Sequence, residues 1–243
     1  KRIKNILVVR NDRFGEFLLN IPAFRALKQS FPGTKLTLAV NPYVEELARC
    51  IDFVDEVITW ENKPHTLGEL IRFSNKLKAQ KFDICVIMNP SKDFNIIALL
   101  AGIPVRVGYD HKLPILHTRR MKDEKCLGHK HEVEYNIDLV RLAGAYTEDK
   151  TLSLNIDSGI VNEVSKYLGN LRDLVALNPF TSDPIKEWPL HNFMQLTQRL
   201  IQELRIKLVL IGGKEELSKK AGIFNDLNEI LIDMVGKTSL VEL

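Results

Sequence analysis

The sequence has few cysteines, few aromatic residues and no long hydrophobic run. Its three cysteines are widely separated and form no CxxC pair, which argues against a disulfide framework or a zinc site and favours a reducing compartment. No apolar stretch reaches the ~18 residues of a membrane-spanning helix. The 34 Lys and Arg nearly balance the 31 Asp and Glu, unlike the concentrated positive charge of most nucleic-acid-binding proteins. These absences predict a cytoplasmic globular protein that binds no nucleic acid.

The sequence does contain a regular alternation of short apolar runs with longer amphipathic stretches. The apolar runs are rich in β-branched residues, which is typical of strands that are covered on both faces. Repetition of strand, helix and strand predicts an α/β fold with parallel, doubly wound sheets. The predicted strands are 6–9, 36–40, 54–60, 83–88, 105–108, 174–177, 207–211 and 230–235. The predicted helices are 15–30, 43–50, 67–79, 94–101, 132–142, 160–168, 191–204 and one that begins at 215.

The alternation is interrupted in the middle of the chain, which predicts two domains. Residues 111–131 carry six Lys or Arg against two acids, and we expect an exposed basic loop there. After a connecting segment at 152–156 the alternation restarts, so we expect domains at 1–156 and 157–243. The second has about three predicted strands, which leave apolar surface uncovered, and it is therefore expected to be incomplete.

The first of three candidate segments begins where the first predicted strand ends. Doubly wound sheets bind ligands at this position. Gly15 allows a close backbone approach, and Glu16 lies in the first turn of the following helix. An ionised carboxylate there can accept a proton from a sugar hydroxyl. Local chemistry alone favours the simpler interpretation that Glu16 only complements the helix dipole, because acids are common in first turns.

The second candidate segment follows the predicted strand 174–177. The hydroxyl groups of Thr181 and Ser182 suit phosphate oxygens, and Lys186 supplies a positive charge for a diphosphate. An ordinary polar turn is the alternative interpretation, because these residue types populate any turn.

The third candidate segment follows the predicted strand 207–211. Gly212 allows a ligand to approach, and an acid at Glu215 or Glu216 can accept hydrogen bonds from ribose hydroxyls. A glycine turn followed by acids at a helix start is an equally ordinary explanation.

No metal site is predicted. His129 and His131 are two residues apart, so on a helix they would diverge, and the HExxH pattern is absent. A phosphate loop at 236–238 is also excluded, because Leu231 stands where that motif needs a glycine.

In their order and spacing, these segments resemble glycosyltransferase family nine, the ADP-heptose:lipopolysaccharide heptosyltransferases. The resemblance is carried by 10–27, 83–87, 102–109, 131–132, 178–179, 186–189, 212–213 and 236–240. It implies a GT-B fold, in which two Rossmann-like domains face each other across a cleft. It also implies inverting transfer without a bound metal or other cofactor. The family carries a further phosphate-binding stretch after 236–240 that has no counterpart here, so the second domain is expected to lack its end.

The resemblance also implies roles for individual residues. Glu16 stands where the family usually has an Asp that acts as general base, and Lys186 would neutralise the departing diphosphate. Glu216 matches the ribose-binding acid, with Glu215 one residue away, and Thr238 lies where the chain passes the adenine. The implied donor-binding residues are Thr181, Ser182, Lys186, Gly212, Glu215, Glu216 and Thr238, and the implied acceptor-binding residues are Arg10, Gly15, Arg119 and Arg120.

The function expected from the resemblance is transfer of heptose from ADP-heptose to a lipopolysaccharide core acceptor at the inner membrane surface. The protein would be cytoplasmic or peripherally bound to the inner face of that membrane. Two alternatives stay open at this point: an inactive nucleotide-sugar-binding remnant, and a transferase that uses another nucleotide-sugar.

Overall fold

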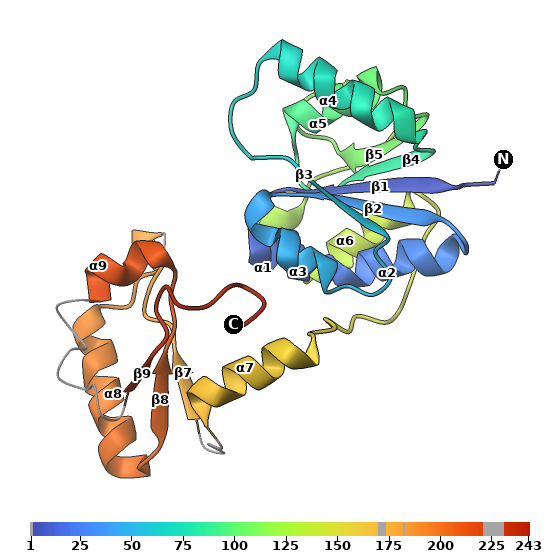
Figure 1. The fold of residues 1–243 in the computed structure, drawn as a ribbon. Coiled ribbons are helices and arrows are strands. Elements are labelled where there is room, and N and C mark those ends of the chain that lie inside the picture. The colour runs from blue at the N-terminus through green and yellow to red at the C-terminus, as the bar shows by residue number, and fades with distance from the viewer. Residues whose placement is uncertain (1, 170–173, 182, 221–230) are drawn as a thin grey trace. The chain divides into compact units, whose positions relative to one another are not determined.

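The computed structural model describes residues 2–169, 174–181, 183–220 and 231–243. The chain divides into two compact units, Lys1–Asn155 and Ile156–Leu243, next to the boundary expected from the sequence. Each unit contains a parallel sheet with helices packed on it, which confirms the predicted α/β class (Figure 1). Among the described residues, no helix is long and apolar enough to cross a membrane.

The first unit is built on a six-stranded sheet in which every neighbouring pair is parallel. The strand order is β3-β2-β1-β4-β5-β6, the order of a Rossmann-type doubly wound sheet. The central strand β1 pairs with both β2 and β4, and its residues from Ile6 onward are buried. The strands are β1 (Asn5–Arg10), β2 (Lys35–Val40), β3 (Glu56–Thr59), β4 (Ile84–Ile87), β5 (Val105–Tyr109) and β6 (Arg119–Met121).

Helices cover both faces of this sheet, as continuous apolar strands require. Helices α4 (Leu67–Gln80) and α5 (Lys92–Leu100) pack together on one face (Figure 1). Their buried side chains, among them Leu77 and Phe94, form a core with Leu7 and Ile87 of the strands. The other face carries α1 (Phe14–Leu18), α2 (Ile21–Ser30), α3 (Glu45–Arg49) and α6 (Glu132–Arg141).

The single helix predicted over 15–30 is wrong, because the structure divides it into α1 and α2. Pro22 lies in the first turn of α2, where a backbone N–H would have no partner within the helix. In one continuous helix, the proline ring would clash with a backbone carbonyl of the preceding turn. The Asn20 side chain bonds the backbone oxygen of Glu16 at 2.5 Å. The break makes α1 a short helix whose first turn carries Glu16.

The exposed basic loop predicted over 111–131 is also wrong in part. Residues Arg119–Met121 form β6, which pairs in parallel with β5. Two arginines in a row give no strand pattern, so the pairing comes from the neighbouring strand and not from local propensity. The remaining residues include the short 3₁₀ helices Pro114–Leu116 and Lys125–Leu127.

The second unit contains a three-stranded parallel sheet in the order β7-β8-β9. Its core joins the strands to the apolar face of α8, which contributes Phe193, Leu200 and Ile201. Helix α7 buries none of its residues. The elements are α7 (Ser158–Leu168), β7 (Leu174–Leu177), α8 (Leu190–Leu204), β8 (Lys207–Leu210), α9 (Leu217–Lys220) and β9 (Leu231–Asp233).

Candidate functional site

A large hollow of the first unit lies where its strand order reverses. Strands β1 and β4 are neighbours in the sheet. The chain continues from β1 to β2 on one side of this pair, and from β4 to β5 on the other side. Loops that leave such a switch point diverge and open a crevice at the carboxyl edge of the sheet. A cavity of about 730 Å³ lies there, lined by Arg10, Asp12, Gly15, Glu16, Leu18, Leu19, Asn89, Pro90, Lys125, Glu132 and Leu152.

Glu16 enters this cavity from the first turn of α1 and is half-buried. Within the described part of the chain, no hydrogen bond or ion pair involves its carboxylate. Gly15 beside it has open space where a side chain would begin, with no atom within 4 Å. An unpaired carboxylate at an open position can accept a proton from a bound hydroxyl group.

The second carboxylate of the cavity, Asp12, is already paired. Its Oδ1 lies 2.7 Å from Nε of Arg10, whose side chain is 4% exposed. The Arg10 Nη1 also donates to the backbone oxygen of Met88 at 3.2 Å. Burial raises the pKa of Asp12 and neighbouring Glu16 raises it further, while Arg10 opposes both. Asp12 therefore holds Arg10 in place, and among the described residues Glu16 is the carboxylate of this cavity that has no partner.

Lys125 and Glu132 complete the charged wall. The Lys125 ammonium lies 2.5 Å from Oε1 of Glu132 and 3.4 Å from Oδ1 of Asn136. It also lies 4.6 Å from the ring centroid of Tyr109, a cation–π contact. Burial lowers the pKa of Lys125, and the hydrogen bond to Glu132 partly offsets that effect.

Asparagine side chains tie the two loops of the crevice together. Nδ2 of Asn89, which follows β4, donates to Oδ1 of Asn11 at 3.0 Å, and the Asn11 N–H donates back to Oδ1 of Asn89 at 3.3 Å. The Tyr43 hydroxyl adds a bond of 2.8 Å to the backbone oxygen of Asp12. These bonds fix the loop that precedes Glu16.

The predicted acceptor residues fall into two groups. Arg10, Gly15 and Glu16 line one cavity. Arg119 and Arg120 lie on the exposed strand β6, and the lining of that cavity does not include them. Nη1 of Arg119 donates to the backbone oxygen of Leu142 at the end of α6, at 2.7 Å. A role for these two arginines in acceptor binding stays a prediction.

In the second unit, the loops that follow β7, β8 and β9 lie together at the carboxyl edge of the sheet. A methyl group on Gly212 would lie 2.7 Å from Cδ2 of Phe180, so the loop after β8 packs directly on the loop after β7. The Gly236 N–H donates to the backbone oxygen of Gly212 at 2.9 Å, which joins the turn after β9 to the same place. Gly236 has φ of +70°, a conformation that favours glycine.

Two of the predicted phosphate-binding residues are described. Oγ1 of Thr181 accepts the Asp183 N–H at 3.1 Å. Lys186 ends a 3₁₀ turn. Its side chain is 68% exposed, and its ammonium lies 3.9 Å from Oδ2 of Asp183. Such an ammonium is accessible to an anion. Ser182 lies outside the described residues.

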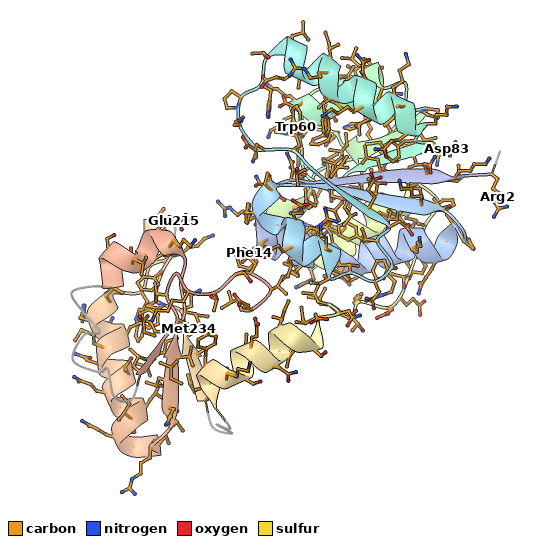
Figure 2. The ribbon with its side chains drawn as sticks, viewed as in Figure 1. Arg2, Phe14, Trp60, Asp83, Glu215 and Met234 are labelled. Atoms are coloured by element: carbon orange, nitrogen blue, oxygen red, sulfur yellow. The ribbon has the colours of Figure 1, made fainter. Side chains whose placement is uncertain are left out.

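The acids predicted to bind ribose fold back over a glycine. A methyl group on Gly213 would lie 2.8 Å from Oε2 of Glu216 and 2.9 Å from Oε2 of Glu215. Glu215 is labelled near the start of α9 in Figure 2. Both carboxylates therefore lie close to the glycine loop after β8. Gly236, two residues before Thr238, is bonded to the same loop through Gly212. A role in ribose binding stays a prediction for each acid.

Sequence reasoning assigned no role to four polar residues that line the first cavity: Asp12, Asn89, Lys125 and Glu132. Asp12 and Asn89 follow the ends of β1 and β4, a signal that the sequence did carry. Lys125 and Glu132 reach the cavity through folding of the chain after β5, for which there was no local signal.

Metal and cysteine chemistry gain no support from the described residues. Within the described ranges, no three His, Cys, Asp or Glu side chains are grouped so that they could hold a metal ion. The three cysteines are free, and burial raises the pKa of Cys85 to about 12, which keeps its thiol protonated.

Two units with parallel, Rossmann-like sheets and polar loops at the carboxyl strand ends are the architecture of the GT-B fold class. The fold matches that of an E. coli ADP-heptose lps heptosyltransferase II with a TM-score of 0.82 and 20% identity, over 98% of this chain and 74% of that one. The family model of glycosyltransferase family 9 (heptosyltransferase) matches residues 70–243, so the chain belongs to this family.

Two curated relatives are similar in sequence. A Haemophilus influenzae protein described as a glycosyltransferase is 28% identical over 97% of this chain and 71% of its own length. Lipopolysaccharide heptosyltransferase 2 of Salmonella typhimurium is 22% identical over 87% of this chain and 64% of its own length. The chain therefore spans less than two thirds of the second relative.

Proposed function

We propose that this chain transfers heptose from ADP-heptose to a lipopolysaccharide core acceptor, with inversion at the anomeric carbon and without a bound metal ion. The observation that carries the proposal is the Glu16 carboxylate, half-buried at the switch point and unpaired within the described chain. The names of the E. coli and Salmonella relatives support the choice of donor and acceptor.

The first unit takes the acceptor. An acceptor hydroxyl in the cavity gives its proton to the Glu16 carboxylate while its oxygen attacks the anomeric carbon of heptose. Arg10 and Asp12 are paired with each other and hold the cavity wall, so Glu16 has no competing partner. The family usually has Asp at this position, and Glu adds one methylene to the reach of the base.

The second unit takes the donor. As the bond between the anomeric carbon and the diphosphate breaks, its electron pair leaves with ADP. Lys186 and the Thr181 hydroxyl, on the loop after β7, neutralise and bind this charge. Glu215 or Glu216 binds the ribose, and Thr238 lies along the adenine.

We place the reaction in the cytoplasm, with the protein bound peripherally at the inner membrane surface that carries the acceptor. The exposed arginines of β6, Arg119 and Arg120, are candidates for contacts with the anionic groups of the core.

The test is the variant Glu16→Gln, which keeps the shape of the side chain and removes the base. With ADP-heptose and a heptose-deficient core acceptor in the presence of EDTA, we expect transfer to fall about 10³-fold, within the usual range for a lost general base. ADP binding measured by calorimetry should stay within about twofold of the unaltered protein, because Glu16 lies outside the second unit.

Glu46→Gln is the matched control, since Glu46 is also a first-turn acid of a short helix but is exposed and lines none of the cavities described. Near-normal transfer by Glu16→Gln would remove Glu16 from the role of base. ADP binding without any transfer would support an inactive nucleotide-sugar-binding protein, and preference for UDP would overturn the donor assignment.

A further inference from the structure

Five charged side chains line the cavity at Glu16: the cations Arg10 and Lys125, and the carboxylates Asp12, Glu16 and Glu132. Asp12 pairs with Arg10, and Glu132 pairs with Lys125. Each cation of the lining therefore has one carboxylate as its partner, and Glu16 is left over. The proposed reaction depends on this, because a carboxylate held in an ion pair is a weaker base and is covered by its partner.

Glu132 is the carboxylate on which this balance of charges depends. Its Oε1 lies 2.5 Å from the Lys125 ammonium and 3.9 Å from Nη1 of Arg10, so it faces both cations of the cavity. The side chains of Glu132 and Lys125 are 23% and 21% exposed, so water screens this pair only in part. An ammonium in such a place needs a partner, since an uncompensated buried charge is costly.

Asn136, one turn after Glu132 on α6, binds the same ammonium and also contacts α1, the helix that carries the proposed base. It is fully buried, with its Oδ1 3.4 Å from the Lys125 ammonium. Its Nδ2 donates to the backbone oxygen of Leu19, at the end of α1, at 3.2 Å. Together with the ring of Tyr109, whose centroid is 4.6 Å from the ammonium, these contacts fix where Lys125 lies.

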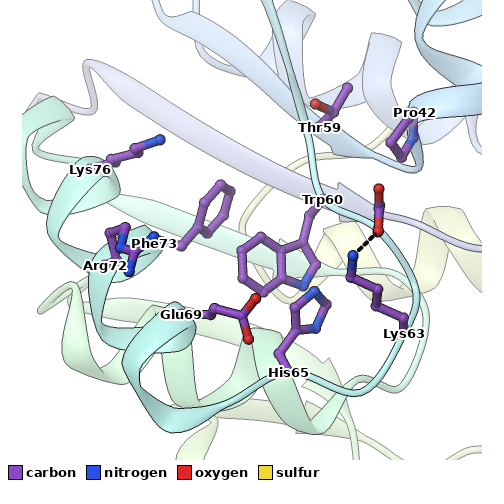
Figure 3. Close-up of a pocket in the computed structure, with 10 residues that line it drawn as sticks. Pro42, Thr59, Trp60, Lys63, His65, Glu69, Arg72, Phe73 and Lys76 are labelled. Atoms are coloured by element: carbon purple, nitrogen blue, oxygen red, sulfur yellow. Dashed lines mark ion pairs between the residues drawn. The ribbon is translucent and has the colours of Figure 1, made fainter.

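A second cavity of the first unit, beside Trp60 at the carboxyl end of β3, has the opposite arrangement of charges (Figure 3). Its carboxylates are engaged, because Glu61 is ion-paired and Glu69 accepts a backbone N–H at 2.7 Å. The cations Arg72 and Lys76 make no ion pair within the described part of the chain. The unpaired groups are therefore cations at this cavity, whereas the unpaired group at the first cavity is a carboxylate.

We propose that Glu132 is a positioning residue for the proposed reaction: it holds Lys125 and so keeps that ammonium from pairing with Glu16. Without the charge of Glu132, the lining has two cations and two carboxylates, and Asp12 is already paired with Arg10. Glu16 is then the acid of the lining that is left for Lys125. The inference rests on the proposed function, since it concerns whether the proposed base is available.

The direct test is a crystal structure of the variant Glu132→Gln, which keeps the shape of the side chain and removes its charge. We expect the Lys125 ammonium to lie within about 4 Å of a carboxylate oxygen of Glu16. Asp123 is the competing acid, because its Oδ1 already accepts the backbone N–H of Lys125 at 3.4 Å. A Lys125 ammonium that keeps its place, or that turns to Asp123, would contradict the inference.

The same variant should transfer heptose at least about tenfold more slowly, with KM for ADP-heptose within about twofold of the parent, because the change affects the base and not the donor. The double variant Glu132→Gln with Lys125→Gln should recover most of the lost rate, since the competing cation is gone. A merely structural role for Glu132 predicts the opposite, because the double variant removes more of the bonding network.

Glu134→Gln is the matched control, a second acid in the first turn of α6 whose carboxylate pairs with Lys150 and which does not line the cavity. The inference is overturned if Glu132→Gln transfers heptose as fast as Glu134→Gln, or if the double variant is as slow as Glu132→Gln. Near-normal transfer by Glu16→Gln would instead remove the proposed function, and it would leave the crystallographic outcome for Lys125 unaffected.

Discussion

The charged side chains around Glu16 form two ion pairs. Asp12 lies against Arg10, and Lys125 lies against Glu132, whose Oε1 is also 3.9 Å from Nη1 of Arg10. Arg10 can serve these neighbours at once because its guanidinium has several donors in a fixed fork. Among the described residues, Glu16 is left as the carboxylate of the cavity without an ion pair, so it is available to a bound hydroxyl group in the proposed reaction.

A different carboxylate, Asp55, shows how a charge stabilises the first unit. Its Oδ2 lies 2.5 Å from the Lys28 ammonium and accepts the Leu36 N–H at 2.6 Å, so it links α2 to the start of β2. Burial opposes ionisation, but these two bonds outweigh it and hold the pKa of Asp55 below its usual value. The stabilisation is present above the unfolded-state pKa of about 3.9 and is lost as the pH falls through the folded-state pKa.

Asp55→Asn should therefore lower the free energy of unfolding at pH 7 by about 0.5–1 kcal/mol, a small effect because the side chain is 40% exposed and solvent screens the pair. It should also reduce the loss of stability below about pH 4. Urea unfolding between pH 7 and pH 3 measures both. Glu46→Gln should change neither, and an Asp55→Asn variant with the same acid loss as the parent would contradict the assignment.

At the scale of elements, α4 begins at a capping box. Oγ1 of Thr66 accepts the Glu69 N–H at 3.4 Å, and the Glu69 carboxylate accepts the Thr66 N–H at 2.7 Å. This start also sets the phase of the helix and so the direction in which Arg72 and Lys76 project.

Thr66→Ala should lower the free energy of unfolding of the first unit by about 1 kcal/mol, because a helix N–H loses its acceptor. Thr66→Ser keeps the hydroxyl and should stay within a few tenths of the parent. Urea unfolding followed by Trp60 emission in a Trp188→Phe background separates the two variants. Equal losses for alanine and serine would show that the hydroxyl is not the stabilising group.

Periodicity predicted most elements, and it failed where non-local contacts decide. The strand at Lys35–Val40 and the helix at Leu67–Gln80 follow from the spacing of apolar residues, which can be read within each segment by itself. The helix break before Pro22 did have a local signal, which is the proline itself. Strand β6 had none, because Arg119 and Arg120 pair with β5 only once the sheet exists.

At the scale of the whole molecule, the two units differ in the size of their cores. The first has a six-stranded sheet covered on both faces. Within its described residues, the second has a three-stranded sheet and an α7 that buries no residue. A smaller unit buries a smaller fraction of its surface and is less stable.

Single-tryptophan variants should reveal this difference. Trp188→Phe leaves Trp60 to report on the first unit, and Trp60→Phe leaves Trp188 to report on the second, so neither substitution lies in the unit it reports. We expect the urea midpoint of the second unit to be roughly 1 M lower and its slope to be smaller, since the slope follows the surface exposed. Identical midpoints and slopes from both probes would show instead that the chain unfolds as one cooperative block.

The sequence by itself determined the α/β class and the place of Glu16 at the end of the first strand, since both depend on neighbours along the chain. The tertiary structure decided which strand lies beside β1, and this brought Asn89 after β4, and Lys125 and Glu132 from beyond β5, to the wall around Glu16. It also assembled Trp60 with Arg72 and Lys76 into a second cavity. Strand order depends on which apolar faces pack together across long separations in sequence, and local periodicity carries no record of that choice.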